Sequence, residues 1–218
     1  TLDAPGAASF GEVRINAFSD AAHLLIAPAL PEFAETFPDV NLGIIVENRP
    51  IDIVAEGYDA GIRYGHLVPE DMVAVALSGP QRWVVAAAPN YLARHGKPDT
   101  PEDLGNHTCL QLLLGDNSRF PWELGTGPDQ KSYRVPGHIT IQDTATTISA
   151  AKAGLGLAYL LESRIAEELA NGQLEIVLED YASTDDPFHM YYSSRHNNHP
   201  GLRGLINIIR KQNGLSRI

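Results

Sequence analysis

Apolar and polar residues alternate over residues 13–17 (Val-Arg-Ile-Asn-Ala), which predicts a β-strand with one buried face. Apolar residues then recur near helical spacing from Ala21 to Phe37, where Pro28 and Pro31 are expected to kink or restart the helix. Further patterns of the first 65 residues predict strands at 41–46 and 59–64 and a short helix at 51–56. Strands separated by helices are typical of βαβ units, so we expect a mainly parallel sheet.

The middle of the chain repeats this alternation and predicts a second α/β unit. Thr100-Pro101-Glu102-Asp103 is close to a capping box, with Pro at the first helical position. Downstream, the apolar spacing after Pro200 predicts an amphipathic final helix. The other expected elements are strands at 83–88, 109–114, 139–142, 155–160, 174–178 and 188–193, and helices at 89–95, 144–153 and 163–170.

Charge narrows the possible partners. The 218 residues carry 16 Lys and Arg against 27 Asp and Glu, a formal net charge of −11 without a basic run. Phosphate binding needs clustered Lys and Arg, so this chain is not expected to bind nucleic acid or an anionic membrane by itself. No apolar run approaches the ~20 residues that span a bilayer.

Common catalytic and cofactor motifs are missing from the sequence. Cys109 is the single cysteine and stands in an apolar run, so we expect a buried, inert thiol and no disulfide. Gly154-Leu155-Gly156 begins a dinucleotide-like pattern, but Tyr159 replaces its third glycine. His196 and His199 are better interpreted as a solvated loop than as metal ligands. We therefore expect no cofactor, no metal and no catalytic residue.

Two strand-to-helix junctions are candidate ligand sites. Ser19 and Asp20 follow the first strand, and Gln142-Asp143-Thr144 opens a later helix. Helix N-termini offer unpaired N–H groups and a positive dipole end, which suit a small polar or anionic ligand. Ser, Asp and Thr are also ordinary N-cap residues, and that interpretation stays open here.

Arg63, followed by Tyr64 and Gly65, is a third candidate. These residues stand at the carboxyl end of a predicted strand, where open α/β sheets bind ligands. An arginine there could form a bidentate contact with a carboxylate. The alternative is a surface arginine that pairs with an acidic residue.

Several segments in a fixed order resemble a known family. They are Asp59-Ala60-Gly61-Ile62-Arg63-Tyr64-Gly65, then Pro89-Asn90-Tyr91-Leu92-Ala93-Arg94-His95-Gly96-Lys97-Pro98, Thr100-Pro101-Glu102-Asp103-Leu104, His107-Thr108-Cys109-Leu110, Ala153-Gly154-Leu155-Gly156-Leu157-Ala158 and Gly172-Gln173-Leu174. From about Gly11 to Lys211, the chain resembles the effector-binding domain of a LysR-type transcriptional regulator.

The resemblance implies a periplasmic-binding-protein type 2-like fold, in which two α/β subdomains are joined by two crossover strands. Subdomain I would comprise residues 11–82 and 185–218, and subdomain II residues 83–184, after a linker remnant at 1–10. A small effector would bind in the cleft between the subdomains.

The family's effector contacts map onto Ser19 after the first strand, Asn48 after the second, and Arg63 with Tyr64 at the third. On the far side they map onto the junction 142–144. Tyr64 and Gly61 depart from the commoner Leu-type residues. Ser19→Ala and Arg63→Ala are expected to weaken effector binding while the melting temperature stays nearly unchanged.

The family also implies a cytoplasmic homodimer or tetramer that binds DNA through an N-terminal winged helix-turn-helix, which this sequence does not contain. Two alternatives share the fold. An exported solute-binding receptor would have a signal peptide before Thr1, and an enzyme would need a catalytic constellation in the cleft. Because the sequence begins with Thr1 and not Met, its N-terminus does not report on a signal peptide.

Overall fold

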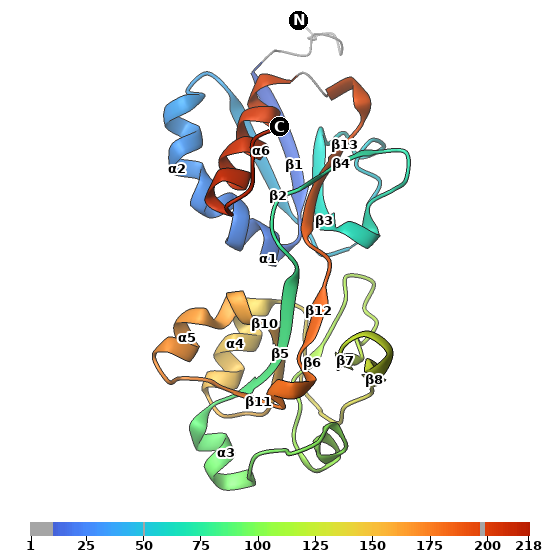
Figure 1. Cartoon of the computed structure of the whole chain (residues 1–218), viewed down its shortest axis with the longest axis vertical. Coiled ribbons are helices and arrows are strands. Elements are labelled where there is room, and N and C mark those ends of the chain that lie inside the picture. Colours follow the sequence, from blue (N-terminus) through green and yellow to red (C-terminus); the bar gives the residue numbers. More distant parts are fainter. Residues whose placement is uncertain (1–10, 50, 197–198) are drawn as a thin grey trace, which may run out of the picture. The chain divides into compact units, whose positions relative to one another are not determined.

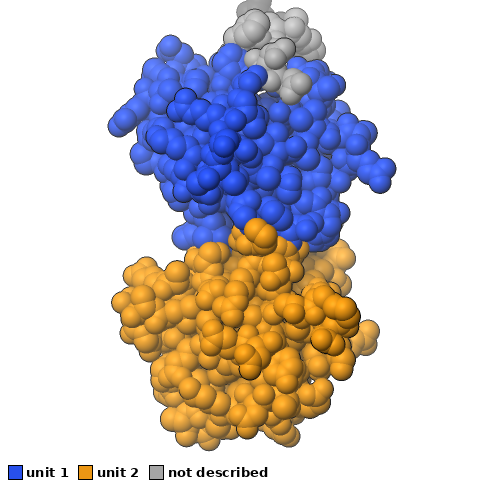
Figure 2. Space-filling view, in the orientation of Figure 1, with its two compact units in different colours: residues 1–47, 51–79, 186–218 blue, residues 48–50, 80–185 orange. Residues whose placement is uncertain are grey.

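The computed structural model describes residues 11–49, 51–196 and 199–218. The expected linker remnant at 1–10 lies outside these residues. Two compact units divide the chain (Figure 2). The first contains residues 1–47, 51–79 and 186–218, and the second contains residues 48–50 and 80–185. The long segment of the second unit therefore begins at Pro80 and ends at Asp185, and the short segment 48–50 is also grouped with that unit.

A five-stranded sheet forms the centre of the first unit (Figure 1). β1 runs parallel to β2 and β3, whereas β13 runs antiparallel to β3 and β4. The strands, in their order across the sheet, are β2 (Asn41–Val46), β1 (Glu12–Ala17), β3 (Ala60–Tyr64), β13 (Phe188–Tyr192) and β4 (Val73–Ala76). The expected parallel arrangement is confirmed for β1, β2 and β3.

Helices pack on the sheet of this unit, and one of these helical segments contains two prolines. α1 (Ser19–Ala21) continues through a π-helical turn at Ala22–Ile26 into α2 (Ala27–Thr36). Pro28 stands in the first turn of α2 and Pro31 lies inside it, so the helix continues past both prolines, directly after the π-helical turn. α6 (Pro200–Gln212) has the expected amphipathic face. It approaches α2 so closely that a side chain at Gly204 would meet the ring of Phe37.

The helix expected at 51–56 is wrong, because residues 53–57 form turns. The carboxylate of Asp52 accepts the backbone N–H groups of Val54 (2.9 Å) and Ala55 (3.0 Å). These are the hydrogen bonds of a helix N-cap, and the N–H of Glu56 also donates to the carbonyl of Asp52 at 3.0 Å, so a single helical turn forms here. Gly57 then adopts φ +74°, which ends the turn before β3.

The second unit is built around β5 (Gln81–Ala87). Its partners β10 (Ala158–Leu161), β11 (Glu175–Val177) and β12 (Ser183–Asp185) all run antiparallel to it. The parallel arrangement that was predicted for the first three strands therefore does not recur around β5. Helical segments do separate its strands, but the chain returns to β5 in the opposite direction each time.

Around this sheet, the predicted helices and capping box are present in the second unit. The carboxylate of Asp103 accepts the N–H of Thr100 at 2.8 Å, which completes the capping box of a 3-10 helix at Pro101–Asn106. The expected helix at 163–170 is a 3-10 turn, Glu162–Ile165, that continues into α5. The α-helices are α3 (Pro89–His95), α4 (Thr144–Lys152) and α5 (Ala166–Ala170).

Short strand pairs complete the second unit. The strand expected at 109–114 is reduced to β6 (Gln111–Leu112), which pairs in parallel with β9 (Thr140–Ile141). A hairpin that the sequence pattern did not predict joins β7 (Trp122–Leu124) to β8 (Lys131–Tyr133).

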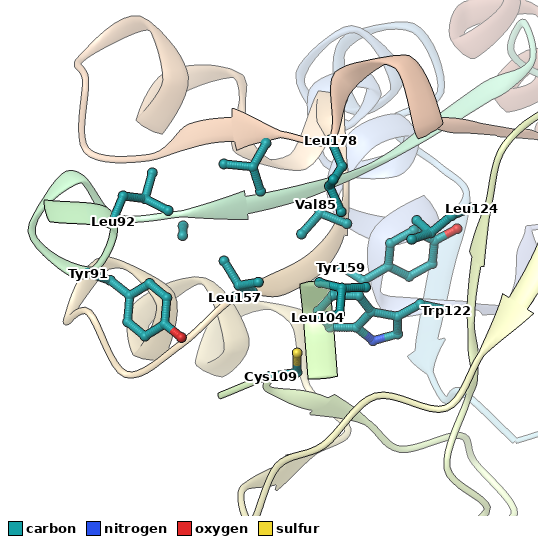
Figure 3. Packing of buried hydrophobic residues seen from close by; sticks show 12 residues of the cluster. Val85, Tyr91, Leu92, Leu104, Cys109, Trp122, Leu124, Leu157, Tyr159 and Leu178 are labelled. Carbon is teal, nitrogen blue, oxygen red and sulfur yellow. The ribbon is translucent and has the colours of Figure 1, made fainter. Parts of the chain in front are cut away.

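Cys109 lies in the apolar core of the second unit, beside residues such as Leu104 and Leu157 (Figure 3). The thiol is fully buried and is free of any disulfide. Burial raises the pKa of Cys109 to about 12, so the reactive thiolate is disfavoured. The expected inert core cysteine is confirmed.

Candidate functional site

The junction after β1 places Ser19 and Asp20 in the first turn of α1. Phe18, and not either of these residues, occupies the N-cap position, and no side chain caps the helix there. The interpretation of Ser19 and Asp20 as N-caps is therefore wrong. The helix begins one residue earlier than an N-cap at Ser19 would require, and the carbonyl of Phe18 accepts the N–H of Ala22 at 2.9 Å.

Arg63 is a buried side chain, with a relative exposure of 3%, and this excludes the interpretation of a surface arginine. Its Nη2 donates to Oδ1 of Asn16 at 2.5 Å, and its Nη1 donates to the carbonyl of Ile62 at 2.7 Å. The guanidinium also lies over the ring of Phe18, 4.3 Å from its centroid. These contacts explain why a cation can be buried at the end of β3.

Burial lowers the pKa of the Arg63 guanidinium from its usual value, and nearby Tyr191 and Glu47 oppose that effect. An arginine stays protonated despite such a shift. The carboxyl ends of β1 and β3 therefore meet around a desolvated positive charge, since Ala17 pairs with Ile62. Such a charge attracts anionic oxygen atoms more strongly than one in water.

Tyr64 and Gly65 extend this group of residues. The ring of Tyr64 lies 5.9 Å from that of Phe18 and stacks on Phe188 at 4.7 Å. Gly65 donates its N–H to the carbonyl of Pro187 at 3.1 Å. A Cβ at Gly65 would stand 3.0 Å from the ring of His189, so a larger residue would crowd this edge of the sheet.

The structure groups Asn48 with the second unit. Its backbone and that of Arg49 approach Gly115 so closely that a Cβ at Gly115 does not fit. Asn48 is thus not brought to Arg63 within the first unit, although it follows β2 in sequence.

Gln142, Asp143 and Thr144 come together at the start of α4. Asp143 is the N-cap, and its carboxylate accepts the backbone N–H of Thr146 at 2.8 Å and its hydroxyl at 2.6 Å. These hydrogen bonds lower the pKa of Asp143. Gln142 donates through Nε2 to the carbonyl of Leu114 at 3.2 Å. The capping alternative for Asp143 is therefore confirmed.

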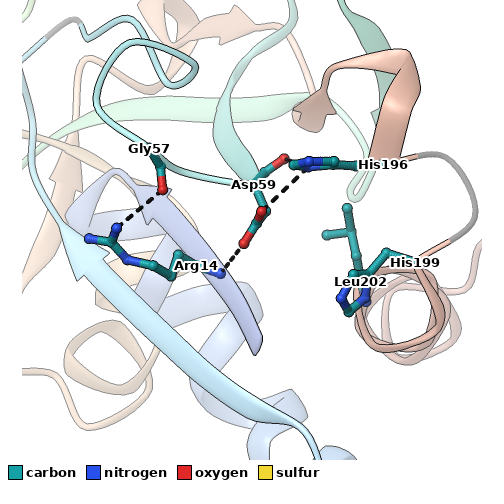
Figure 4. Close-up of polar contacts among 6 residues, drawn as sticks. All are labelled: Arg14, Gly57, Asp59, His196, His199 and Leu202. Atoms are coloured by element: carbon teal, nitrogen blue, oxygen red, sulfur yellow. Dashed lines mark hydrogen bonds and ion pairs between the residues drawn. The ribbon is translucent and has the colours of Figure 1, made fainter. Parts of the chain in front are cut away.

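His196 and His199 do not converge on a common point (Figure 4). Nδ1 of His196 lies 3.0 Å from the carbonyl oxygen of Asp59 and 3.5 Å from its carboxylate. His199 instead caps α6, where it accepts the N–H of Leu202. Over the part of the chain that the structure describes, no three His, Cys, Asp or Glu side chains form a group that could hold a metal ion.

Asn16 and Phe18 are the two residues around Arg63 that sequence reasoning missed. One signal was available for Asn16, because asparagine is depleted in strands and this one stands within a predicted strand. Phe18 gave no signal, since its role depends on the register of β1 against β3.

Residues 7–214 match the model of the LysR substrate binding domain. The chain belongs to this family. It is 34% identical over 200 residues to YcaN, an uncharacterized HTH-type transcriptional regulator of Escherichia coli K12. That alignment covers 92% of this chain and 65% of YcaN. The HTH-type transcriptional activator TtdR of the same strain is 29% identical over 181 residues, which cover 83% of this chain and 58% of TtdR.

Solved LysR structures have the same fold. The regulatory domain of CrgA, a LysR-type transcriptional regulator from Neisseria meningitidis, is 25% identical with a TM-score of 0.80; the match covers 93% of this chain and 98% of that domain. The expected periplasmic-binding-protein type 2-like fold is confirmed. This LysR domain spans less than two thirds of the length of YcaN and TtdR. No helix among its described residues is long and apolar enough to cross a membrane.

Proposed function

We propose that this LysR domain senses a small effector and thereby regulates transcription by the protein of which it is a part. The observation that carries the proposal is the buried guanidinium of Arg63, held at the carboxyl end of β3 by Asn16 and Phe18. Membership of the LysR family supports it, because the relatives named above are transcriptional regulators.

The effector proposed here is a small polar molecule that bears a carboxylate, and it binds in a cleft between two subdomains with boundaries near residues 82 and 184. The desolvated charge of Arg63 favours such an anion. Asp143 works against such an anion, because the two hydrogen bonds from Thr146 lower its pKa and keep its carboxylate charged. The proposed contacts are Ser19, Asp20, Asn48, Arg63, Tyr64, Gly65, Gln142, Asp143 and Thr144.

Regulation would act through the rest of the protein. Effector binding shifts the equilibrium between two arrangements of the subdomains or of the dimer, to the extent that the effector binds one arrangement more tightly. The change reaches DNA through an N-terminal winged helix-turn-helix. In this proposal the regulator is a cytoplasmic homodimer or tetramer without enzymatic activity, and the domain alone does not retard DNA at physiological salt.

A thermal-shift screen of small aromatic and aliphatic acids tests the proposal. A ligand at 100 times its Kd adds about 2.7 kcal/mol to the free energy of unfolding, which raises the melting temperature by roughly 5–11 °C for a domain of this size. Ser19→Ala should weaken the binding of any acid so identified. Ser132→Ala is the control, because Ser132 is an exposed residue on β8.

Equal affinity of Ser19→Ala, Ser132→Ala and the unmodified domain would show that the proposed site is misplaced. Specific DNA binding by the isolated domain would contradict the proposal that a separate N-terminal winged helix-turn-helix binds DNA. Stabilisation by neutral metabolites instead of acids would preserve the sensing function and exclude the carboxylate.

A further inference from the structure

Asn16 is the next-to-last residue of β1 and is fully buried. Across the sheet it is paired with Ile45 of β2 and Gly61 of β3, and Gly61 is paired in turn with Tyr191 of β13. Partners in register point to the same face of a sheet. These four residues form a row across β2, β1, β3 and β13, in which Asn16 carries a polar amide. Arg63 stands two residues after Gly61 on β3, and so on the same face.

Arg63 fixes the orientation of the Asn16 amide. A guanidinium can only donate hydrogen bonds, so the oxygen of the amide must be the atom that faces it, 2.5 Å from Nη2. This contact removes the usual ambiguity between the oxygen and the nitrogen of an asparagine side chain. Nδ2 consequently points away from Arg63.

Nδ2 of Asn16 is buried and has no hydrogen-bond partner among the residues that the structure describes. Its neighbours on this face form no hydrogen bond with it, although the Tyr191 hydroxyl lies beside Gly61, 2.7 Å from where a Cβ would stand. Ile45 is apolar, and Gly61 has no side chain because the ring of Tyr191 occupies the space, 2.6 Å from where a Cβ would stand. Tyr191 packs with Ile53 and Tyr58 in an apolar cluster.

A buried amide nitrogen without an acceptor is rare in native proteins and is costly, which indicates that an external oxygen satisfies it. The hydrogen bond from Arg63 holds the Asn16 amide in this orientation. The same guanidinium is desolvated, so an oxygen that carries negative charge gains more at this point than a neutral one.

We propose that Asn16 determines the specificity of effector binding, by donating a hydrogen bond from Nδ2 to a carboxylate oxygen of the effector. Arg63 is the positioning residue that turns the amide toward the ligand. The inference rests on the proposed sensing function and adds one contact and one ligand class to it. An effector without an oxygen acceptor at this point is rejected, because it leaves Nδ2 buried and unpaired.

Asn16→Asp tests the contact with almost no change of shape. The new carboxylate still accepts from Arg63, so the domain should stay folded, but it replaces the N–H donor by an acceptor that repels the ligand. The probes are sodium benzoate and sodium succinate, followed by thermal shift and calorimetric titration. The affinity for the acid that binds should fall by about 10- to 100-fold, as expected for the loss of a hydrogen bond to a charged group.

Asn41→Asp is the matched control, since Asn41 is an exposed residue at the start of β2 and the change of charge is the same. It should bind the acid as the unmodified domain does. A second readout needs no variant, because the side-chain amide signal of Asn16 in a ¹H–¹⁵N spectrum should shift when the acid is added.

Each outcome decides a different point. Loss of affinity in Asn16→Asp alone, or a shifted Asn16 amide signal, supports the inference. Equal affinity in both variants overturns it and indicates that a fixed water satisfies Nδ2, while the sensing function stands. If neither acid binds the unmodified domain, the inference falls with its carboxylate class, and a neutral ligand found by the wider screen would still support sensing.

Discussion

Replacing Arg63 by alanine should destabilise the first unit strongly. The substitution leaves two buried acceptors, Oδ1 of Asn16 and the carbonyl of Ile62, without their donor, and each such loss costs about 1–3 kcal/mol. Loss of the contact with Phe18 adds roughly 0.5–2 kcal/mol. Relief of the desolvated charge offsets part of this sum. We expect a net decrease in the free energy of unfolding of about 2–4 kcal/mol.

Thermal unfolding measures this effect directly. For a domain of this size, 1 kcal/mol corresponds to about 2–4 °C, so the melting temperature should fall by roughly 4–16 °C. Arg82→Ala is the control, because Arg82 is partly exposed and forms ion pairs with Glu162 (2.9 Å) and Glu179 (3.6 Å). Such pairs contribute at most about 1 kcal/mol.

Equal melting temperatures for Arg63→Ala and Arg82→Ala would contradict this expected destabilisation. They would mean that the hydrogen bonds of Arg63 contribute no more than a surface ion pair. The sequence alone led us to expect a nearly unchanged melting temperature for Arg63→Ala. The burial and hydrogen bonds of Arg63 replace that expectation with a decrease.

Four further outcomes follow from the second unit. Tyr91→Phe should cost about 1–2 kcal/mol, measured by urea unfolding, because its hydroxyl accepts the N–H of Thr108 at 3.0 Å. Burial, and to a smaller extent the charge of His95, lowers the pKa of His107. The unfolded chain therefore binds more protons than the folded one, and the free energy of unfolding should fall as pH drops below about 6.5. His107→Gln should flatten this pH dependence. Cys109 should resist iodoacetamide at pH 8 until urea unfolds the domain. Asp143→Ala should cost about 1 kcal/mol through the lost cap, and Asp143→Asn much less.

Local patterns predicted the elements whose stability is local. The helix at Pro89–His95 and the capping box at Thr100–Asp103 need only contacts between neighbouring residues, and both are present. The helix expected at 51–56 failed for a local reason too, since Gly57 at φ +74° ends the segment after the one turn that Asp52 caps. Strand direction in the second unit depends on how the chain returns to β5, which periodicity does not report.

The candidate site was predictable only in part. Position at a strand end selected Arg63 and Tyr64, and the structure does bring them together with Phe18. The burial of Arg63 and its bond to Asn16 depend on contacts 47 residues apart in sequence, so no local pattern could predict them. The roles of Ser19 and Asn48 as effector contacts stay predictions.

The most direct test of the central claim uses the full-length regulator and the acid that stabilises this domain. Footprinting on its own promoter region should be carried out with and without a saturating concentration of that acid. The acid should change the footprint or the affinity for DNA, and Asn16→Asp should need a higher acid concentration for the same change. Identical footprints and affinities at saturation would contradict the claim that this domain senses an effector to regulate transcription.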